Sequence, residues 1–168
     1  MWIKFRKDPE KALEETLKKL QLNYIDIYMD HWPSGIDYRK DPEDGSFEMI
    51  SIYDFWPKME HLVDIGKVKY LGVSNYNVQC LCNLLSFSRI KPVVNEVEYH
   101  PFYIQNELKE FCDKVNISII SYRPLPCGYG TRIFFKEYPD FNIFKDELII
   151  KLSKEYKKTP GQIILNWH

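Results

Sequence analysis

The sequence lacks the features that mark several large classes of protein. Its 168 residues carry 23 Lys and Arg against 24 Asp and Glu, a formal net charge of −1, and the cations are scattered. A balanced charge gives no electrostatic attraction to nucleic acid or to an anionic membrane. The N-terminal segment MWIKFRKDPEKALEE has no apolar core of a secretory signal, and no apolar run approaches the ~20 residues of a membrane span. We therefore expect neither nucleic acid nor membrane as a partner.

Several motifs are also missing. No strand-like segment is followed by G-x-G-x-x-G, so a Rossmann dinucleotide site has no support, and there is no P-loop. The four cysteines, Cys80, Cys82, Cys112 and Cys127, show no C-x-x-C spacing. We expect reduced thiols, no metal site and a cytoplasmic setting.

What the sequence does contain is a regular alternation of helical and extended segments. Asp8-Pro9-Glu10 has the composition of a helix start, with Asp as the cap and Pro in the first turn. Short segments rich in β-branched and aromatic residues predict strands, and apolar residues at helical spacing predict helices. The predicted strands are 24–31, 68–73, 92–98 and 117–122, and the predicted helices are 9–20, 53–65, 77–87, 105–114, 145–156 and a short one from 160.

Two long irregular stretches, 34–52 and 126–144, interrupt this alternation. Loops of such length are usually functional. Gly66 is expected to end the helix over 53–65. Alternating helices and strands of this kind form parallel sheets with helical crossovers.

Polar residues gather where the predicted strands end. They are His31, Ser74, Asn75, Asn95, Glu96 and Tyr122. In a (β/α) barrel, the carboxyl ends of the strands carry the chemistry. This placement is the strongest physical indication of function in the sequence.

At these strand ends the sequence resembles the aldo-keto reductase family, in particular its aldose and aldehyde reductases. Residues 20–33 resemble L-x-L-D-Y-x-D-L-Y-L-x-H-W-P, and residues 66–77 resemble G-x-V-K-x-I-G-V-S-N-F-N. Residues 92–101 resemble P-V-V-N-Q-V-E-x-H-P, and residues 121–125 resemble A-Y-S-P-L. The end of the chain, 158–167, resembles K-T-P-A-Q-V-L-L-R-W. The resemblance covers essentially the whole chain.

The resemblance implies an α/β fold, a partial (β/α)8 TIM barrel with parallel strands. The four strands correspond to the family's fourth to seventh, so about four of its eight βα units are present. Residues 1–168 are then a single incomplete NADP-dependent oxidoreductase domain. The family is usually monomeric, but the open edges of a partial barrel favour association.

The resemblance also implies roles for individual residues. His31 matches the histidine that orients the substrate carbonyl, and Trp32 matches a residue that lines the substrate pocket. Ser74 and Asn75 match the pair that binds the nicotinamide carboxamide. Tyr122 matches the aromatic residue that stacks on the nicotinamide ring.

The other three catalytic residues of the family have no counterpart here. Its aspartate and tyrosine belong to the second strand, and its lysine would fall just before Met1. The site for the adenosine 2′-phosphate follows the eighth strand, so the NADPH preference comes from the family alone.

Three residues depart from the family's pattern. Glu96 replaces a glutamine that binds the carboxamide, and its charge is expected to favour the oxidised, cationic ring. Arg123 replaces a small residue beside the pyrophosphate path, where it either pairs with phosphate or obstructs it. Asp30 replaces an apolar residue and is expected to point toward the helix layer, where an unpaired carboxylate would be costly or protonated.

The function implied is NADPH-dependent reduction of aldehydes and ketones to alcohols by hydride transfer to a small carbonyl substrate. The alternative is a catalytically inactive binding module derived from the same fold, or a truncated product. His100 is expected to hold its own turn, and His61 to be a surface residue.

Overall fold

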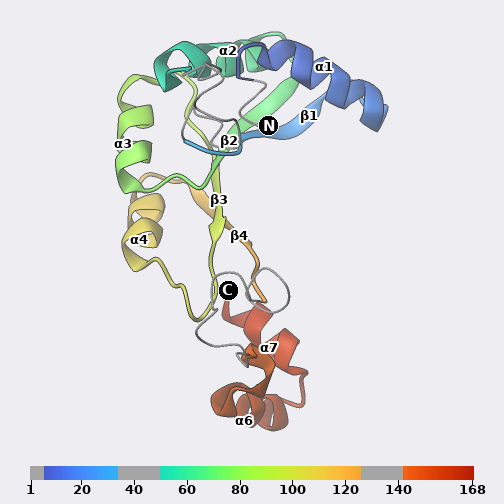
Figure 1. Cartoon of the computed structure of the whole chain (residues 1–168), viewed down its shortest axis with the longest axis vertical. Coiled ribbons are helices and arrows are strands. Elements are labelled where there is room, and N and C mark those ends of the chain that lie inside the picture. Colours follow the sequence, from blue (N-terminus) through green and yellow to red (C-terminus); the bar gives the residue numbers. More distant parts are fainter. Residues whose placement is uncertain (1–5, 34–49, 126–141) are drawn as a thin grey trace, which may run out of the picture. The chain divides into compact units, whose positions relative to one another are not determined.

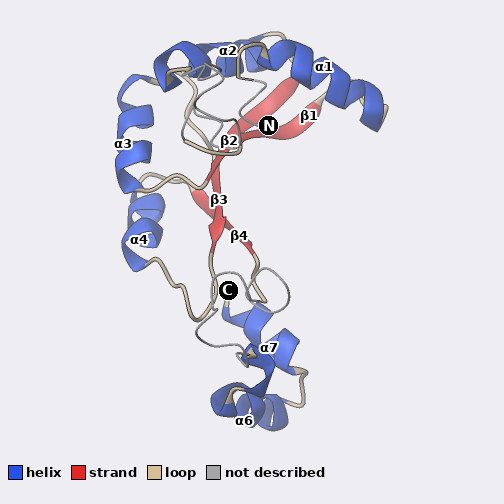
Figure 2. Ribbon diagram, viewed as in Figure 1, coloured by secondary structure: helices blue, strands red, loops and turns tan. Residues whose placement is uncertain are grey.

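The structure is a computed structural model that describes residues 6–33, 50–125 and 142–168 (Figure 1). Helices and strands alternate along the chain, and the four strands form one sheet in the order β1-β2-β3-β4 (Figure 2). The strands are β1 (Ile25–Asp30), β2 (Val68–Ser74), β3 (Val94–Glu98) and β4 (Ser118–Tyr122). The helices are α1 (Pro9–Leu20), α2 (Ile52–Asp64), α3 (Val78–Phe87), α4 (Asn106–Lys114), α6 (Glu147–Tyr156) and α7 (Pro160–Trp167), with a 3-10 turn, η3, at Ile143–Lys145.

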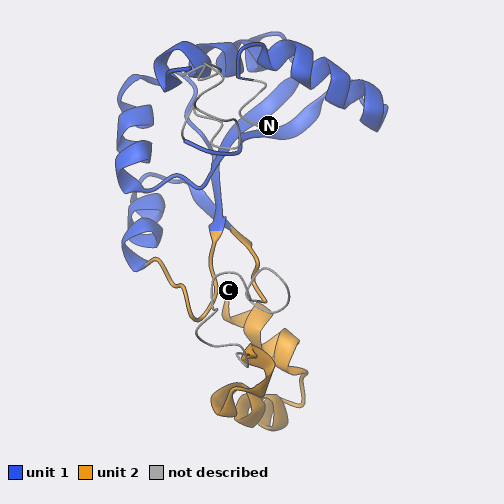
Figure 3. Cartoon of the chain, in the orientation of Figure 1, with its two compact units in different colours: residues 1–97, 106–120 blue, residues 98–105, 121–168 orange. Residues whose placement is uncertain are grey.

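The chain divides into two compact units (Figure 3). The first comprises residues 1–97 and 106–120, and the second comprises residues 98–105 and 121–168. The expectation of one incomplete domain over residues 1–168 stays a prediction. No helix in the described part of the chain is long and apolar enough to cross a membrane.

Local capping chemistry explains where the helices begin. Asp8 accepts a hydrogen bond from Lys11 N at 3.0 Å, and Pro9 occupies the first turn of α1. Ser51 caps α2, and Thr159 forms a capping box with Gln162 at the start of α7. These side chains satisfy backbone N–H groups that have no partner within the helix.

The predicted boundaries are close to the observed ones, and the differences have local causes. Helix α6 begins at Glu147, two residues later than predicted, because Ile143–Lys145 forms a 3-10 turn and Asp146 is the cap. Helix α2 begins one residue early, at Ile52, and Gly66 follows its end with a φ of 71°. Most of the two predicted loops, residues 34–49 and 126–141, lies outside the described residues.

The sheet is parallel, and its register separates two faces. Tyr28 of β1 aligns with Leu71 of β2, and both are buried. One residue earlier in each strand, Ile27 aligns with Tyr70, and these two side chains are 37% and 54% exposed. Because side chains alternate along a strand, these two neighbouring pairs face opposite sides of the sheet, and the side of Tyr28 and Leu71 is the buried one at this point.

Helix α2 supplies much of the core of the first unit. It packs on β2, and α1 packs on α2. The Trp56 indole is buried and donates from Nε1 to Ile90 O at 2.9 Å, so its polar atom is satisfied. The fully buried apolar side chains of α2, β2 and α3 are Phe55, Trp56, Met59, Leu62, Leu71, Val73, Leu81 and Leu84.

Gly72 lies in β2 between two side chains of the neighbouring strands. It aligns with Met29 of β1 and with Val94 of β3. A Cβ at this position would lie 2.6 Å from Met29 Cγ and 2.6 Å from Val94 Cγ2. The two neighbouring side chains thus occupy the volume that any other residue would need.

We expect the substitution Gly72→Ala to destabilise the chain by about 1–3 kcal/mol, because the added methyl overpacks the space between Met29 and Val94. Urea unfolding followed by circular dichroism measures this. The matched control is Gly161→Ala in α7, where an added Cβ would lie 3.8 Å from Phe144 Cε1. The control should gain up to about 1 kcal/mol from helix propensity. Equal effects of the two substitutions would contradict the packing argument.

Candidate functional site

The carboxyl end of β2 is tied to β3 by a side chain and by the backbone. Ser74 Oγ donates to the carbonyl oxygen of Glu96 at 2.8 Å, and the backbone N–H of Asn75 donates to the same oxygen at 2.9 Å. Ser74 is 4% exposed. The predicted cofactor residues Ser74, Asn75 and Glu96 therefore lie together where the end of β2 pairs with the middle of β3.

Asn75 also connects this end of the sheet to β1. Its side-chain amide nitrogen, Nδ2, donates to the carbonyl oxygen of His31 at 2.8 Å and lies 3.1 Å from Ser74 Oγ. Asn75 has a φ of 63°, in the left-handed region that asparagine tolerates better than most residues. The structure thus brings His31 next to the predicted carboxamide-binding pair.

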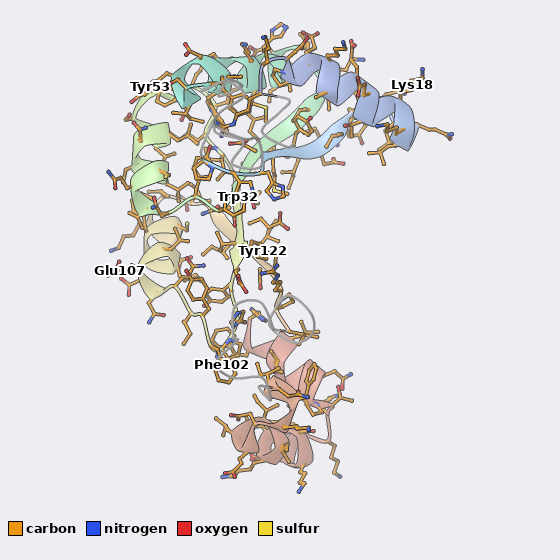
Figure 4. All side chains as sticks on the ribbon, viewed as in Figure 1. Lys18, Trp32, Tyr53, Phe102, Glu107 and Tyr122 are labelled. Carbon is orange, nitrogen blue, oxygen red and sulfur yellow. The ribbon has the colours of Figure 1, made fainter. Side chains whose placement is uncertain are left out.

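His31 and Trp32 follow directly after β1 and are both half-buried. Their rings stack with centroids 5.9 Å apart and an interplanar angle of 28°. Trp32 is labelled in Figure 4 and belongs to the first unit. The carbonyl oxygen of Trp32 accepts a hydrogen bond from Arg6 Nη2. Side-chain donors therefore bind both of the consecutive carbonyls of His31 and Trp32.

Asp30, the last residue of β1, is fully buried, as expected for a side chain on the helix-facing side of the strand. The carboxylate is not unpaired. Arg6 Nε donates to Asp30 Oδ1 at 3.3 Å, Arg6 Nη2 donates to Asp30 Oδ2, and Tyr76 Oη donates to Asp30 Oδ2 at 2.7 Å. An ion pair and a hydroxyl donor thus offset the cost of burying this charge.

The protonation equilibria of this cluster follow from its burial. Burial raises the pKa of Asp30, while the guanidinium of Arg6 and the hydroxyl of Tyr76 act in the opposite direction. Burial and the nearby carboxylate of Asp30 raise the pKa of Tyr76, so its phenol keeps its proton. Tyr76 can then serve only as a hydrogen-bond donor toward Asp30.

Arg6 and Tyr76 were not predicted as partners in the site, and Asn95 was named only as a polar residue near a strand end. Asn95 is fully buried and binds both backbone groups of Tyr76, accepting from its N–H at 3.4 Å and donating to its carbonyl at 2.8 Å. A charged residue at the end of β1, where the family has an apolar one, was the signal that a cation could lie nearby. Arg6 lies 24 residues earlier in the sequence, where no periodicity points to it.

Tyr122 and Arg123 lie in the second unit. Tyr122, labelled in Figure 4, ends β4 and is half-buried. The Arg123 guanidinium lies 5.9 Å from the centroid of the Tyr122 ring, and Arg123 Nη1 lies 3.6 Å from Glu98 Oε2. Arg123 is therefore close to a carboxylate within the second unit. Pairing with a phosphate and obstruction of its path both stay predictions.

No group of three His, Cys, Asp or Glu within residues 6–33, 50–125 and 142–168 is placed to hold a metal ion. Cys80, Cys82 and Cys112 are free thiols, and Cys127 lies outside the described residues. His61 is exposed on α2.

His100 holds the turn after β3, as expected. Its Nδ1 accepts from Phe102 N at 3.3 Å, and its backbone N–H and carbonyl pair with those of Tyr103. His100 is 1% exposed, and its Nε2 lies 3.5 Å from Glu98 Oε1. An Nδ1 that accepts a hydrogen bond requires the neutral ring.

Four parallel strands alternating with helices, with polar residues at the strand ends, define part of a (β/α) barrel. The sequence model of the aldo/keto reductase family matches residues 5–168. The chain therefore belongs to the aldo/keto reductase family.

Individual relatives agree with this assignment. The chain is 38% identical over 168 residues to aldo-keto reductase family 1 member A1 of Gallus gallus. The alignment covers 95% of this chain and 50% of that protein. The aldose reductase of Giardia lamblia has a TM-score of 0.81 at 29% identity, covering 97% of this chain and 53% of that chain.

An aldo-keto reductase of Bombyx mori in complex with NADP has a TM-score of 0.80 at 32% identity, covering 95% of this chain and 50% of that chain. The chain spans about half the length of the curated relatives it matches. Its structural neighbours are aldose reductase TIM barrels, so the predicted partial barrel is confirmed.

His100 gives a testable pH dependence. Burial, together with the nearby His168, lowers the pKa of His100 below its ordinary value of 6.5, while the carboxylate of Glu98 acts to raise it. Below about 6.5 the unfolded chain binds the proton more readily than the folded chain, so stability should fall as the pH falls through this value. We expect the variant His100→Gln to lose less stability over the same pH range.

Chemical unfolding of the wild type and the variant at a series of pH values measures this difference. The control is His61→Gln, which replaces a histidine exposed on α2. This control should keep the pH dependence of the wild type. A His100→Gln variant as acid-sensitive as the wild type would contradict the assignment of the effect to His100.

Proposed function

We propose that this chain is the nicotinamide-binding part of a cytoplasmic, NADPH-dependent carbonyl reductase that acts on small aldehydes and ketones. The observation that carries the proposal is a cluster in which the side chains of Ser74 and Asn75, at the end of β2, bind the backbone carbonyls of Glu96 in β3 and of His31 just after β1. Family membership supports the reaction class. The reducing, cytoplasmic setting is supported by the cysteine spacing of the sequence.

The groups at this cluster are chemically suited to a nicotinamide carboxamide. A carboxamide has one carbonyl acceptor and an NH2 donor. Ser74 supplies a hydroxyl and Asn75 an amide at the end of β2, and Glu96, which aligns with Ser74, supplies a carboxylate from β3. The carboxylate of Glu96 can accept from the NH2 group but cannot donate to the carbonyl. Donation would fall to Ser74 or Asn75, and each would have to exchange a hydrogen bond that it makes in this structure, Ser74 to Glu96 O or Asn75 to His31 O or Ser74 Oγ.

Each residue of the proposed site would act either on the cofactor or on the substrate. When bound, NADPH would supply the hydride. His31 would donate a hydrogen bond to the substrate carbonyl oxygen and orient it, and Trp32 would cover the apolar part of the substrate. Tyr122 would stack on the nicotinamide ring and leave one ring face open for transfer. Asn75 would serve two groups, since its amide also binds the carbonyl of His31.

Fluorescence titration of the purified chain with NADPH tests binding, and aldehyde-dependent loss of NADPH absorbance tests turnover. Binding with turnover supports a reductase, and binding without turnover supports the alternative of an inactive binding module. The absence of binding to both NADPH and NADP⁺ would refute the proposal for this chain.

Glu96 gives a sharper prediction. A negative charge beside the nicotinamide stabilises the cationic ring of NADP⁺ relative to the neutral ring of NADPH. We expect Glu96→Gln to shift the ratio of the two affinities toward NADPH by about 2- to 5-fold, the range of a partly exposed charge pair. Parallel titrations with both cofactors measure the ratio.

The matched control is Glu107→Gln on α4, which is labelled in Figure 4 and is exposed. It removes the same charge away from the strand ends and should leave the ratio unchanged. If Glu96→Gln and Glu107→Gln behave alike, Glu96 does not face the nicotinamide ring.

A further inference from the structure

We infer that Arg6, Asp30 and Tyr76 form a buried network that positions the His31–Trp32 segment, which makes them positioning residues of the proposed carbonyl site. The structural part of this inference stands on the contacts of the first unit alone. Its chemical meaning, the placement of the carbonyl-orienting histidine, rests on the proposed function.

The network begins with a branched contact of one guanidinium. Arg6 is fully buried and donates to both carboxylate oxygens of Asp30. The same guanidinium donates to the carbonyl oxygens of Trp32 and, at 3.4 Å, of Ile50. Arg6 also lies over the Phe55 ring, 4.7 Å from its centroid. Only arginine has enough donors in a fixed plane to reach these acceptors together.

The second anchor of the network comes from the segment that follows β2. Tyr76 Oη donates to Asp30 Oδ2 at 2.7 Å, and Tyr76 is 2% exposed. The backbone of Tyr76 is in turn bound on both sides by Asn95 of β3. Asp30 is therefore fixed from two directions, by the N-terminal segment and by the segment that follows β2.

The position of the acceptor carbonyls indicates why this network matters for the site. Sheet pairing between β1 and β2 extends to Asp30, which aligns with Val73. His31 and Trp32 come immediately after this last pair. Asn75 binds the carbonyl of His31, and Arg6 binds the carbonyl of Trp32. Beyond the last pair of β1 and β2, side-chain donors thus bind the backbone carbonyls of His31 and Trp32 in place of a neighbouring strand.

Stability alone does not account for such a network. Replacing a buried ion pair by apolar residues of similar volume is often neutral or stabilising, so a buried pair is weak evidence for a stabilising role. A branched contact that ends on the backbone of Trp32 fixes a geometry instead. Removing one member should therefore move His31 and Trp32 as well as change the free energy of unfolding.

The test uses the full 168-residue chain with 5-fluorotryptophan and labelled histidine, observed by NMR. The Trp32 and His31 signals are assigned from the variants Trp32→Phe and His31→Gln. We expect Tyr76→Phe, which removes only the hydroxyl, to shift or broaden the Trp32 and His31 signals. Arg6→Lys keeps the positive charge but lacks the planar guanidinium with its several N–H donors. It should shift these signals further or split the Trp32 signal in two.

Matched controls separate this effect from a general loss of order. Tyr53→Phe removes a hydroxyl that donates to Asn83 Oδ1 at 2.6 Å, on the exposed side of α2. Arg89→Lys changes an arginine paired with Asp64 at 2.7 Å. Both controls lie in the same unit, and both should leave the Trp32 and His31 signals in place.

The NMR signals of Trp32 and His31 either support or overturn the positioning role of Arg6, Asp30 and Tyr76. Folded variants with unmoved Trp32 and His31 signals would show that the network only stabilises the fold, and would overturn the positioning role. If Arg6→Lys does not fold, the milder Tyr76→Phe decides alone. The NMR readout needs no cofactor, so a chain that fails to bind NADPH refutes the proposed function without affecting this result.

Discussion

The carboxylate of Asp30 is fully buried at the end of β1, and its partners Arg6 and Tyr76 connect several parts of the first unit. A charge buried in this way is tolerated only when it is paired and hydrogen-bonded. Arg6 and Tyr76 meet both conditions, and each is tied to further elements of the unit. The N-terminal segment, the end of β1 and the residue after the Ser74–Asn75 pair are thereby joined at one point.

The strand ends combine two demands on the same side chains. Asn75 is expected to bind a nicotinamide, yet its amide nitrogen already binds the backbone of His31. Ser74 similarly joins β2 to β3 through the carbonyl of Glu96. The geometry of a binding site and the integrity of the sheet are therefore coupled, because losing either side chain would change both. Such coupling is expected where ligands bind at the carboxyl ends of parallel strands.

Much of the fold could be predicted from local signals. The cap Asp8 with Pro9 predicted α1, and the apolar strand patterns predicted β1 to β4. The predicted start of α6 was two residues early because Asp146, one residue beyond that start, is the cap, and its side chain accepts from Leu148 N and Ile149 N. The spacing of apolar residues does not fix the first residue of a helix.

The candidate site was predictable in its membership but not in its connections. The strand-end residues could be named from their positions, whereas the partner of Asp30 required tertiary structure, since Arg6 is remote in sequence.

The close packing around Gly72 has a consequence for how sequences in the family can diverge. Positions 29, 72 and 94 share one volume, so a larger residue at 72 requires a smaller neighbour at 29 or 94. These three positions should change in concert, as a set whose total size is conserved.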